Sequence, residues 1–215
     1  MRLFRFFKKE KSCVREPNRD EIKITNEEFY EVCVLNTSKD STKMFVSFIK
    51  NKEQGYKNMV VKQSTYHKCL EIKRKRDEDY TLLCKTSSLN NKGIALEKDK
   101  NIEEAIKVYE ENVKLGYPAT HSYDRLMILY SRIKDPENEV RIIKKAIEVF
   151  NEENNRKANC SIEKNPQFKE QILEALKSEG KVMGDNGFYI FSSYNIEKYK
   201  QRLIKARVRL KKLSV

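Results

Sequence analysis

The clearest hydrophobic pattern in the chain lies between residues 86 and 153, where apolar side chains recur at helical spacing in two similar segments. Setting Gly93 over Met127 gives an offset of 34 residues between these segments. Short polar breaks at 99–101 and 134–136 divide each segment into two amphipathic helices. Repeated helix pairs of this length are typical of stacked helical arrays. The pattern therefore predicts a mainly α fold built from helical hairpins.

Two repeats cannot bury their own apolar faces, so we expect the flanks to supply further helices. Residues 167–176 form one candidate helix with a broad apolar face. A second begins near Asn195, where apolar residues then recur at steps of four and three: Tyr199, Leu203, Ala206, Leu210 and Leu213. Between them, the Asn-Gly pair at 186–187 predicts a short β-hairpin near residues 182–191. We expect residues 154–215 to form a third helical pair with this hairpin and a basic capping helix.

The region 21–85 has a less decisive pattern. Residues 26–35 follow a plausible helix cap but contain the β-branched and aromatic residues typical of strands. Residues 44–49 share this ambiguity, whereas the spacing over 57–76 favours a helix. We favour an all-helical region, and a small α+β arrangement remains the alternative. Residues 1–20 form a separate basic N-terminal segment.

The segment 86–153 resembles the tetratricopeptide repeat (TPR) family. The resemblance rests on the run from Leu89 to Gly93, on Leu96, and on the motifs at 103–109 and 145–150. A small residue such as Gly93 allows two helix axes to approach closely. The second unit departs from the family pattern in two places, where Met127 replaces the small residue and Glu139 aligns with Ala105.

The resemblance implies that a partner binds in a concave groove lined by the first helix of each unit. The family's groove positions fall here on Asn90, Ile94, Glu97, Lys98, His121, Asp124, Ile128, Ser131 and Arg132. Some family members hold a C-terminal carboxylate with a Lys followed four residues later by Asn, and neither unit has that pair. We therefore expect a different peptide or helix as the ligand.

The net charge of +13 is distributed unevenly along the chain. Residues 1–85 carry an excess of seven cations and residues 154–215 an excess of eight, whereas 86–153 carry a slight acidic excess. One concentration lies on the predicted C-terminal helix, where a basic face comprises Lys198, Arg202, Lys205, Arg209 and Lys212. We favour the solvated surface of a capping helix for this face, and an acidic partner, nucleic-acid phosphates or a membrane surface remain alternatives.

The chain has none of the common catalytic or phosphate-binding motifs. Its two histidines and five cysteines lack the paired spacing of a zinc site, so we expect no metal, no cofactor and no enzyme activity. The irregular cysteines indicate reduced thiols and hence a cytoplasmic location. No apolar run is long enough to span a membrane.

The sequence thus favours a non-enzymatic helical-repeat module for protein–protein interaction, a scaffold-type basic protein whose ligand is a protein or peptide of acidic character. The alternative is a nucleic-acid-associated protein that uses its basic flanks, including the Lys-Arg-Lys-Arg run at 73–76. A further alternative is weak recruitment to a membrane surface by the basic, aromatic residues 1–9.

Overall fold

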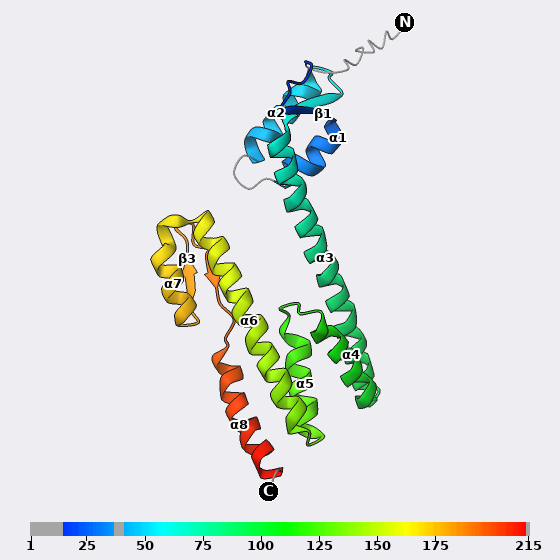
Figure 1. Cartoon of the computed structure of the whole chain (residues 1–215), viewed down its shortest axis with the longest axis vertical. Coiled ribbons are helices and arrows are strands. Elements are labelled where there is room, and N and C mark those ends of the chain that lie inside the picture. The colour runs from blue at the N-terminus through cyan, green and yellow to red at the C-terminus, as the bar shows by residue number, and fades with distance from the viewer. Residues whose placement is uncertain (1–14, 37–40, 214–215) are drawn as a thin grey trace, which may run out of the picture. The chain divides into compact units, whose positions relative to one another are not determined.

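The computed structural model describes residues 15–36 and 41–213 (Figure 1). The chain divides into two compact units, Met1–Thr81 and Leu82–Val215. A long helix, α3 (Gln63–Lys98), begins in the first unit and ends in the second. No helix of the described residues is long and apolar enough to cross a membrane.

The first unit is a small α+β arrangement, the second of the two alternatives for this region. Strand β1 (Glu21–Thr25) pairs antiparallel with β2 (Asn58–Lys62), and Ile24 lies opposite Met59. Residues 58–62 form a strand rather than the start of a helix, because Met59 and Val61 both project from one face into the core while their neighbours do not. The core also contains Phe29 and Cys33.

Short helical segments close the first unit over its two strands. The side chain of Thr25 accepts the backbone N–H of Glu28 and so caps α1 (Asn26–Glu28), which continues as the π-helical segment η1 (Phe29–Val34). The amide of Asn51, in α2 (Ser41–Glu53), donates to the Asn26 side chain and to the Asn58 carbonyl. These bonds fix the end of α2 to the first residue of α1 and to the first residue of β2.

The second unit stacks the end of α3, α4 (Ile102–Lys114), α5 (Thr120–Arg132) and the first half of α6 (Pro136–Lys164). A Cβ on Gly93 would lie 2.3 Å from Cε1 of the buried Tyr109, so only glycine permits this approach of α3 and α4. Met127 is fully buried in the same core. Asp135 caps α6 by accepting the backbone N–H of Asn138.

Residues 154–215 are arranged differently from the expected third helical pair. The helix α6 continues to Lys164, and its second half packs against η2 (Pro166–Phe168), α7 (Lys169–Lys177) and the hairpin of β3 (Lys181–Met183) and β4 (Tyr189–Ser192). The last helix, α8 (Glu197–Leu213), packs on the first half of α6 (Figure 1). Helices α7 and α8 therefore bury their apolar faces in separate clusters on one long helix.

The loop before α8 explains this separation. Asn154 exchanges two hydrogen bonds with the backbone of Tyr194, and the Tyr194 hydroxyl donates to the carbonyl of Pro118. Both oxygens of Glu179 accept N–H groups at the start of α8. The prediction of a mainly helical fold with a short β-hairpin near 182–191 is confirmed.

Candidate partner-binding cleft at the start of α6

Asn90, a predicted groove residue, points into the second unit. Its Oδ1 accepts hydrogen bonds from Asn112 on α4, at 2.8 Å, and from Ser122 on α5, at 2.6 Å. Asn112 also donates to the carbonyl of Thr86. These bonds join Asn90 to side chains of two other helices, so Asn90 helps to fix the stack of three helices.

Glu97, a second predicted groove residue, is also engaged within the unit. Its carboxylate forms a two-point ion pair with the guanidinium of Arg125 on α5 and accepts a hydrogen bond of 2.8 Å from the hydroxyl of Tyr109. The Arg125 guanidinium holds the pKa of Glu97 below its usual value. His121 packs edge-on against the Tyr109 ring, with the centroids 5.8 Å apart.

The remaining groove positions are more accessible. Ile94, Ile128 and Ser131 are partly buried, and Lys98 and Arg132 are exposed. On α5, residues 128, 131 and 132 lie at helical spacing, so their side chains share one face. This face leads to the end of α5, where α6 begins.

Helix α8 is held on α6 by stacked aromatic rings and by a buried charge cluster. The rings of Phe150 and Tyr199 stack with centroids 5.4 Å apart. Nearer the start of α6, Glu139 is completely buried. Its two carboxylate oxygens accept hydrogen bonds from Nε of Arg202, at 3.2 Å, and from Nη2 of Arg209, at 2.7 Å. Glu139, which aligns with Ala105 at the offset of 34 residues, is thus the partner of two arginines of α8.

The predicted basic face of α8 consequently has two parts. Arg202 and Arg209 neutralise Glu139, and the ammonium group of Lys198 lies 3.5 Å from the carboxylate of Asp124 on α5. Lys205 and Lys212 are exposed, and neither forms an ion pair with another described residue. The structure therefore brings the predicted basic face next to the predicted groove face of α5.

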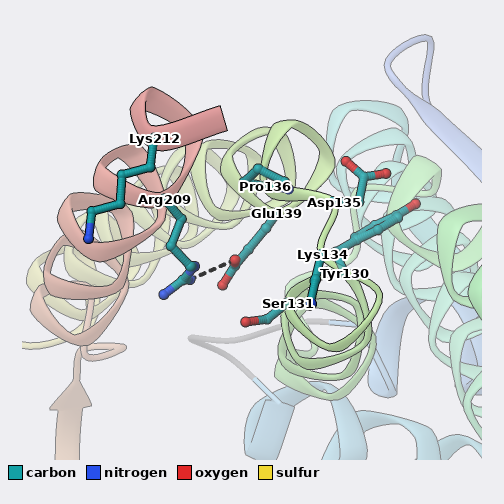
Figure 2. Close-up of a pocket in the computed structure, with 8 residues that line it drawn as sticks. All are labelled: Tyr130, Ser131, Lys134, Asp135, Pro136, Glu139, Arg209 and Lys212. Atoms are coloured by element: carbon teal, nitrogen blue, oxygen red, sulfur yellow. Dashed lines mark hydrogen bonds and ion pairs between the residues drawn. The ribbon is translucent and has the colours of Figure 1, made fainter. Parts of the chain in front are cut away.

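A cleft of about 290 Å³ opens where the end of α5, the start of α6 and the end of α8 meet (Figure 2). Its walls are mainly the carbon atoms of polar and charged side chains. The lining residues are Tyr130, Ser131, Lys134, Asp135, Pro136, Glu139, Arg209 and Lys212. Of these, Ser131, Arg209 and Lys212 were site residues in the sequence prediction.

The polar groups of the cleft are largely satisfied within the protein. The Tyr130 hydroxyl donates to Glu110 at 2.6 Å, and burial together with this bond raises the pKa of Tyr130 above its usual range. Asp135 is occupied as the cap of α6. Lys134 adopts a left-handed backbone conformation, with φ of 58°, at the turn between α5 and α6. The cleft thus exposes cations and carbon surface.

The two other basic segments of the sequence are the run at 73–76 and residues 1–9. In the run at 73–76, carboxylates of the same helix pair with each cation: Glu71, Asp77 and Glu78. These exposed pairs balance the local charge of α3. The proposed membrane-binding residues 1–9 lie outside the described part of the chain.

The His, Cys, Asp and Glu side chains of the described residues were also candidate metal ligands or reactive groups. In the ranges 15–36 and 41–213, no three His, Cys, Asp or Glu side chains come together to hold a metal ion. Burial, reinforced by the neighbouring Cys69, raises the pKa of the Cys33 thiol to about 12, so this thiol stays protonated at neutral pH.

Sequence reasoning missed the contributions of Tyr130, Lys134, Asp135, Pro136 and Glu139 to the cleft. The one available signal was Glu139, an acid at a position where the repeat pattern requires a small buried residue. An acid at such a position indicates a cationic partner, but the sequence does not tell which segment supplies it. Comparison of the chain with protein families, curated proteins and solved structures finds no match.

Proposed function

We propose that the second unit is a non-enzymatic protein-interaction module that captures a short segment of a partner protein along α5 and in the cleft between α5, α6 and α8. The observation that carries this proposal is the cleft itself, an opening with carbon walls and exposed cations at the end of a helix face that holds Ile128, Ser131 and Arg132. Clefts of this kind accommodate side chains of a bound peptide.

The arrangement of the helices supports the assignment of residues 86–153 to a TPR-like array as part of this proposal. The helices alternate with short turns, and a glycine makes the close crossing of the first pair. The proposed ligand position differs from the simple family groove, because Asn90 and Glu97 are used inside the stack. A cytoplasmic location belongs to the same proposal and is supported by the free thiols of the described cysteines.

The test is selection of random displayed peptides on the full chain, followed by affinity measurements with a variant of the proposed face. We expect the enriched peptides to lose at least about tenfold in affinity when Ile94, Ile128 and Arg132 are all replaced by Ser, because the contact surface is removed. Ile94 and Ile128 are only partly buried and Arg132 is exposed, so the variant should keep its helical circular dichroism.

A matched control replaces Leu83, Lys144 and Ile204 by Ser, which also removes two accessible apolar side chains and one cation. The control should bind the selected peptides as the unmodified chain does. If no peptide is enriched, or if the enriched peptides bind both variants equally, the proposed function is wrong.

A further inference from the structure

We propose that the cleft between α5, α6 and α8 receives an apolar side chain from a short acidic segment of the partner, and that Lys134, Arg209 and Lys212 hold the flanking carboxylates. This inference rests on the proposed function and specifies the chemistry of its ligand. It follows from three observations, on the size of the cleft, on the state of its carboxylates and on its accessible cations.

The cleft has a size and a lining that suit a side chain. At about 290 Å³ it lies just below the range of roughly 300–1,000 Å³ that is usual for sites of small molecules and cofactors. Its walls are mainly carbon, contributed in part by Tyr130 and Pro136. Transfer of an apolar side chain from water into such a cleft is favourable, because it removes apolar area from contact with water.

The two carboxylates of the cleft do not repel an acidic ligand strongly, because both are already bound. Glu139 has no exposed surface, and each of its oxygens accepts from one arginine. Asp135 accepts from the backbone and from the side-chain amide of Asn138. The charge of Glu139 is therefore offset by two arginines, and the oxygens of Asp135 are used in the cap of α6.

The cations are accessible on both sides of the opening. Arg209 and Lys212 come from α8 on one side, and Lys134 comes from the turn after α5 on the other (Figure 2). The Arg209 side chain is 45% exposed although it binds Glu139. Within the described residues, Lys134 and Lys212 form no ion pair with a carboxylate. Carboxylates on either side of an apolar side chain of the ligand would form ion pairs with these two lysines.

Other occupants fit the same observations less well. A second copy of this chain carries the same net charge of +13, so its approach to a cationic cleft is opposed by repulsion. A nucleic acid would meet cations at the rim, but the carbon walls offer its phosphates no partner, and the Lys-Arg run of α3 is already paired. An acidic protein segment can pair its carboxylates with the cations at the rim and place an apolar side chain against the carbon walls.

The experiment measures fluorescence anisotropy of labelled probes with the full chain. The probes are an Asp/Glu-rich peptide with a central Leu-Phe pair, its Asn/Gln isostere, the acidic peptide with Ser in place of Leu-Phe, and an oligothymidine. We expect the first peptide to bind at least about tenfold more tightly than the other two peptides and the oligothymidine.

The variant that tests the site combines Lys134→Glu with Lys212→Glu. We expect this variant to bind the acidic peptide at least about tenfold more weakly, because the charge at both sides of the cleft then repels the carboxylates of the peptide. The control combines Lys114→Glu with Lys144→Glu, which changes the net charge equally at exposed residues that do not line the cleft. The control should retain most of the affinity.

Several results would overturn the inference. If the Asn/Gln isostere binds as tightly as the acidic peptide, carboxylates have no role in recognition. If the acidic peptide loses the same affinity for the Lys134→Glu/Lys212→Glu variant and for the control variant, the cleft is not its binding site. Binding of the oligothymidine that depends on Lys134 and Lys212 would assign the surface to phosphates. A change from dimer to monomer in the Lys134→Glu/Lys212→Glu variant would assign it to a second copy. If none of the synthetic peptides binds while displayed peptides are enriched, the acidic chemistry is wrong and the proposed function stands.

Discussion

Single residues of the second unit are fixed by their surroundings. Glycine at 93 is required because a Cβ would overlap the ring of Tyr109. Glu97 links three helices, since it lies on α3 and binds Arg125 of α5 and Tyr109 of α4. The carboxylate is charged in this network, and its pKa lies below the ordinary value of 4.5. The stability of the unit should therefore depend on pH through this residue.

Replacement of Glu97 by Gln should reduce the free energy of unfolding by about 2 kcal/mol at pH 7, where the lost bonds include charge-assisted ones. Because the folded-state pKa is lowered, the contribution of Glu97 is fully present above the ordinary pKa of 4.5 and is lost as the pH falls from there through the lowered folded-state pKa. The difference in stability between the Glu97→Gln variant and the unmodified chain should therefore be smaller at pH 3 than at pH 7 in urea unfolding.

The control for this measurement is Glu104→Gln. Glu104 forms an exposed pair with Lys107, so its replacement should change stability by less than about 1 kcal/mol at either pH. A Glu97→Gln effect that stays constant between pH 3 and pH 7 would contradict the assignment of a charged, stabilising carboxylate.

At the scale of the element, α8 is both the cap of the helical stack and one wall of the cleft. Its apolar contacts with α6 are reinforced by the cluster of Glu139, Arg202 and Arg209. The members differ in exposure, because Glu139 is fully buried and the two arginine side chains are 32% and 45% exposed. An arginine that loses its partner can thus turn to water, whereas Glu139 cannot.

This difference in exposure predicts that loss of Glu139 and loss of its two arginines reduce the stability of the unit by different amounts. Replacement of Glu139 by Gln should cost about 2 kcal/mol, whereas Arg202→Met combined with Arg209→Met should cost about 3–5 kcal/mol, because it leaves a buried charge without a partner. Chemical denaturation measures both losses, and hydrogen exchange should locate the first opening at α8.

A third variant, with Met at all three positions, should recover most of the stability lost in the double arginine variant, since no buried charge remains. Equal losses in the two variants above, or no recovery with three Met residues, would show that the buried charge does not control the docking of α8.

At the scale of the whole molecule, the chain consists of two compact units with separate cores. The first is a two-stranded sheet closed by short helices, and the second is the helical stack with its cleft. Helix α3 belongs to both, and its 36 residues pass through the boundary near Thr81. Separate cores lead us to expect separate unfolding transitions.

A fragment of residues 82–215 should fold alone and unfold with the midpoint of one of two transitions in the full chain, as measured by calorimetry. A second fragment that ends at residue 195 should lose this cooperative transition, because α8 no longer covers the apolar face of α6. A single transition in the full chain, or an unfolded 82–215 fragment, would contradict the division into two units.

The sequence alone determined the features that follow from local spacing. The helical periods over residues 86–153 and after residue 195, and the Asn-Gly turn of the hairpin, specify elements whose residues are neighbours along the chain. These features sufficed for the mainly helical fold class and for two sides of the cleft, Ser131 on α5 and Arg209 with Lys212 on α8.

The way in which these elements meet follows from contacts between residues far apart in the chain. The pairing of Met59 with Ile24, and that of Glu139 with Arg202 and Arg209, join residues far apart in sequence, and no local pattern records such partners. For the same reason the sequence did not show that Asn90 and Glu97, two predicted groove residues, bind side chains of other helices. Periodicity specifies which face of a helix is apolar, but burial and charge pairing depend on which other element covers that face.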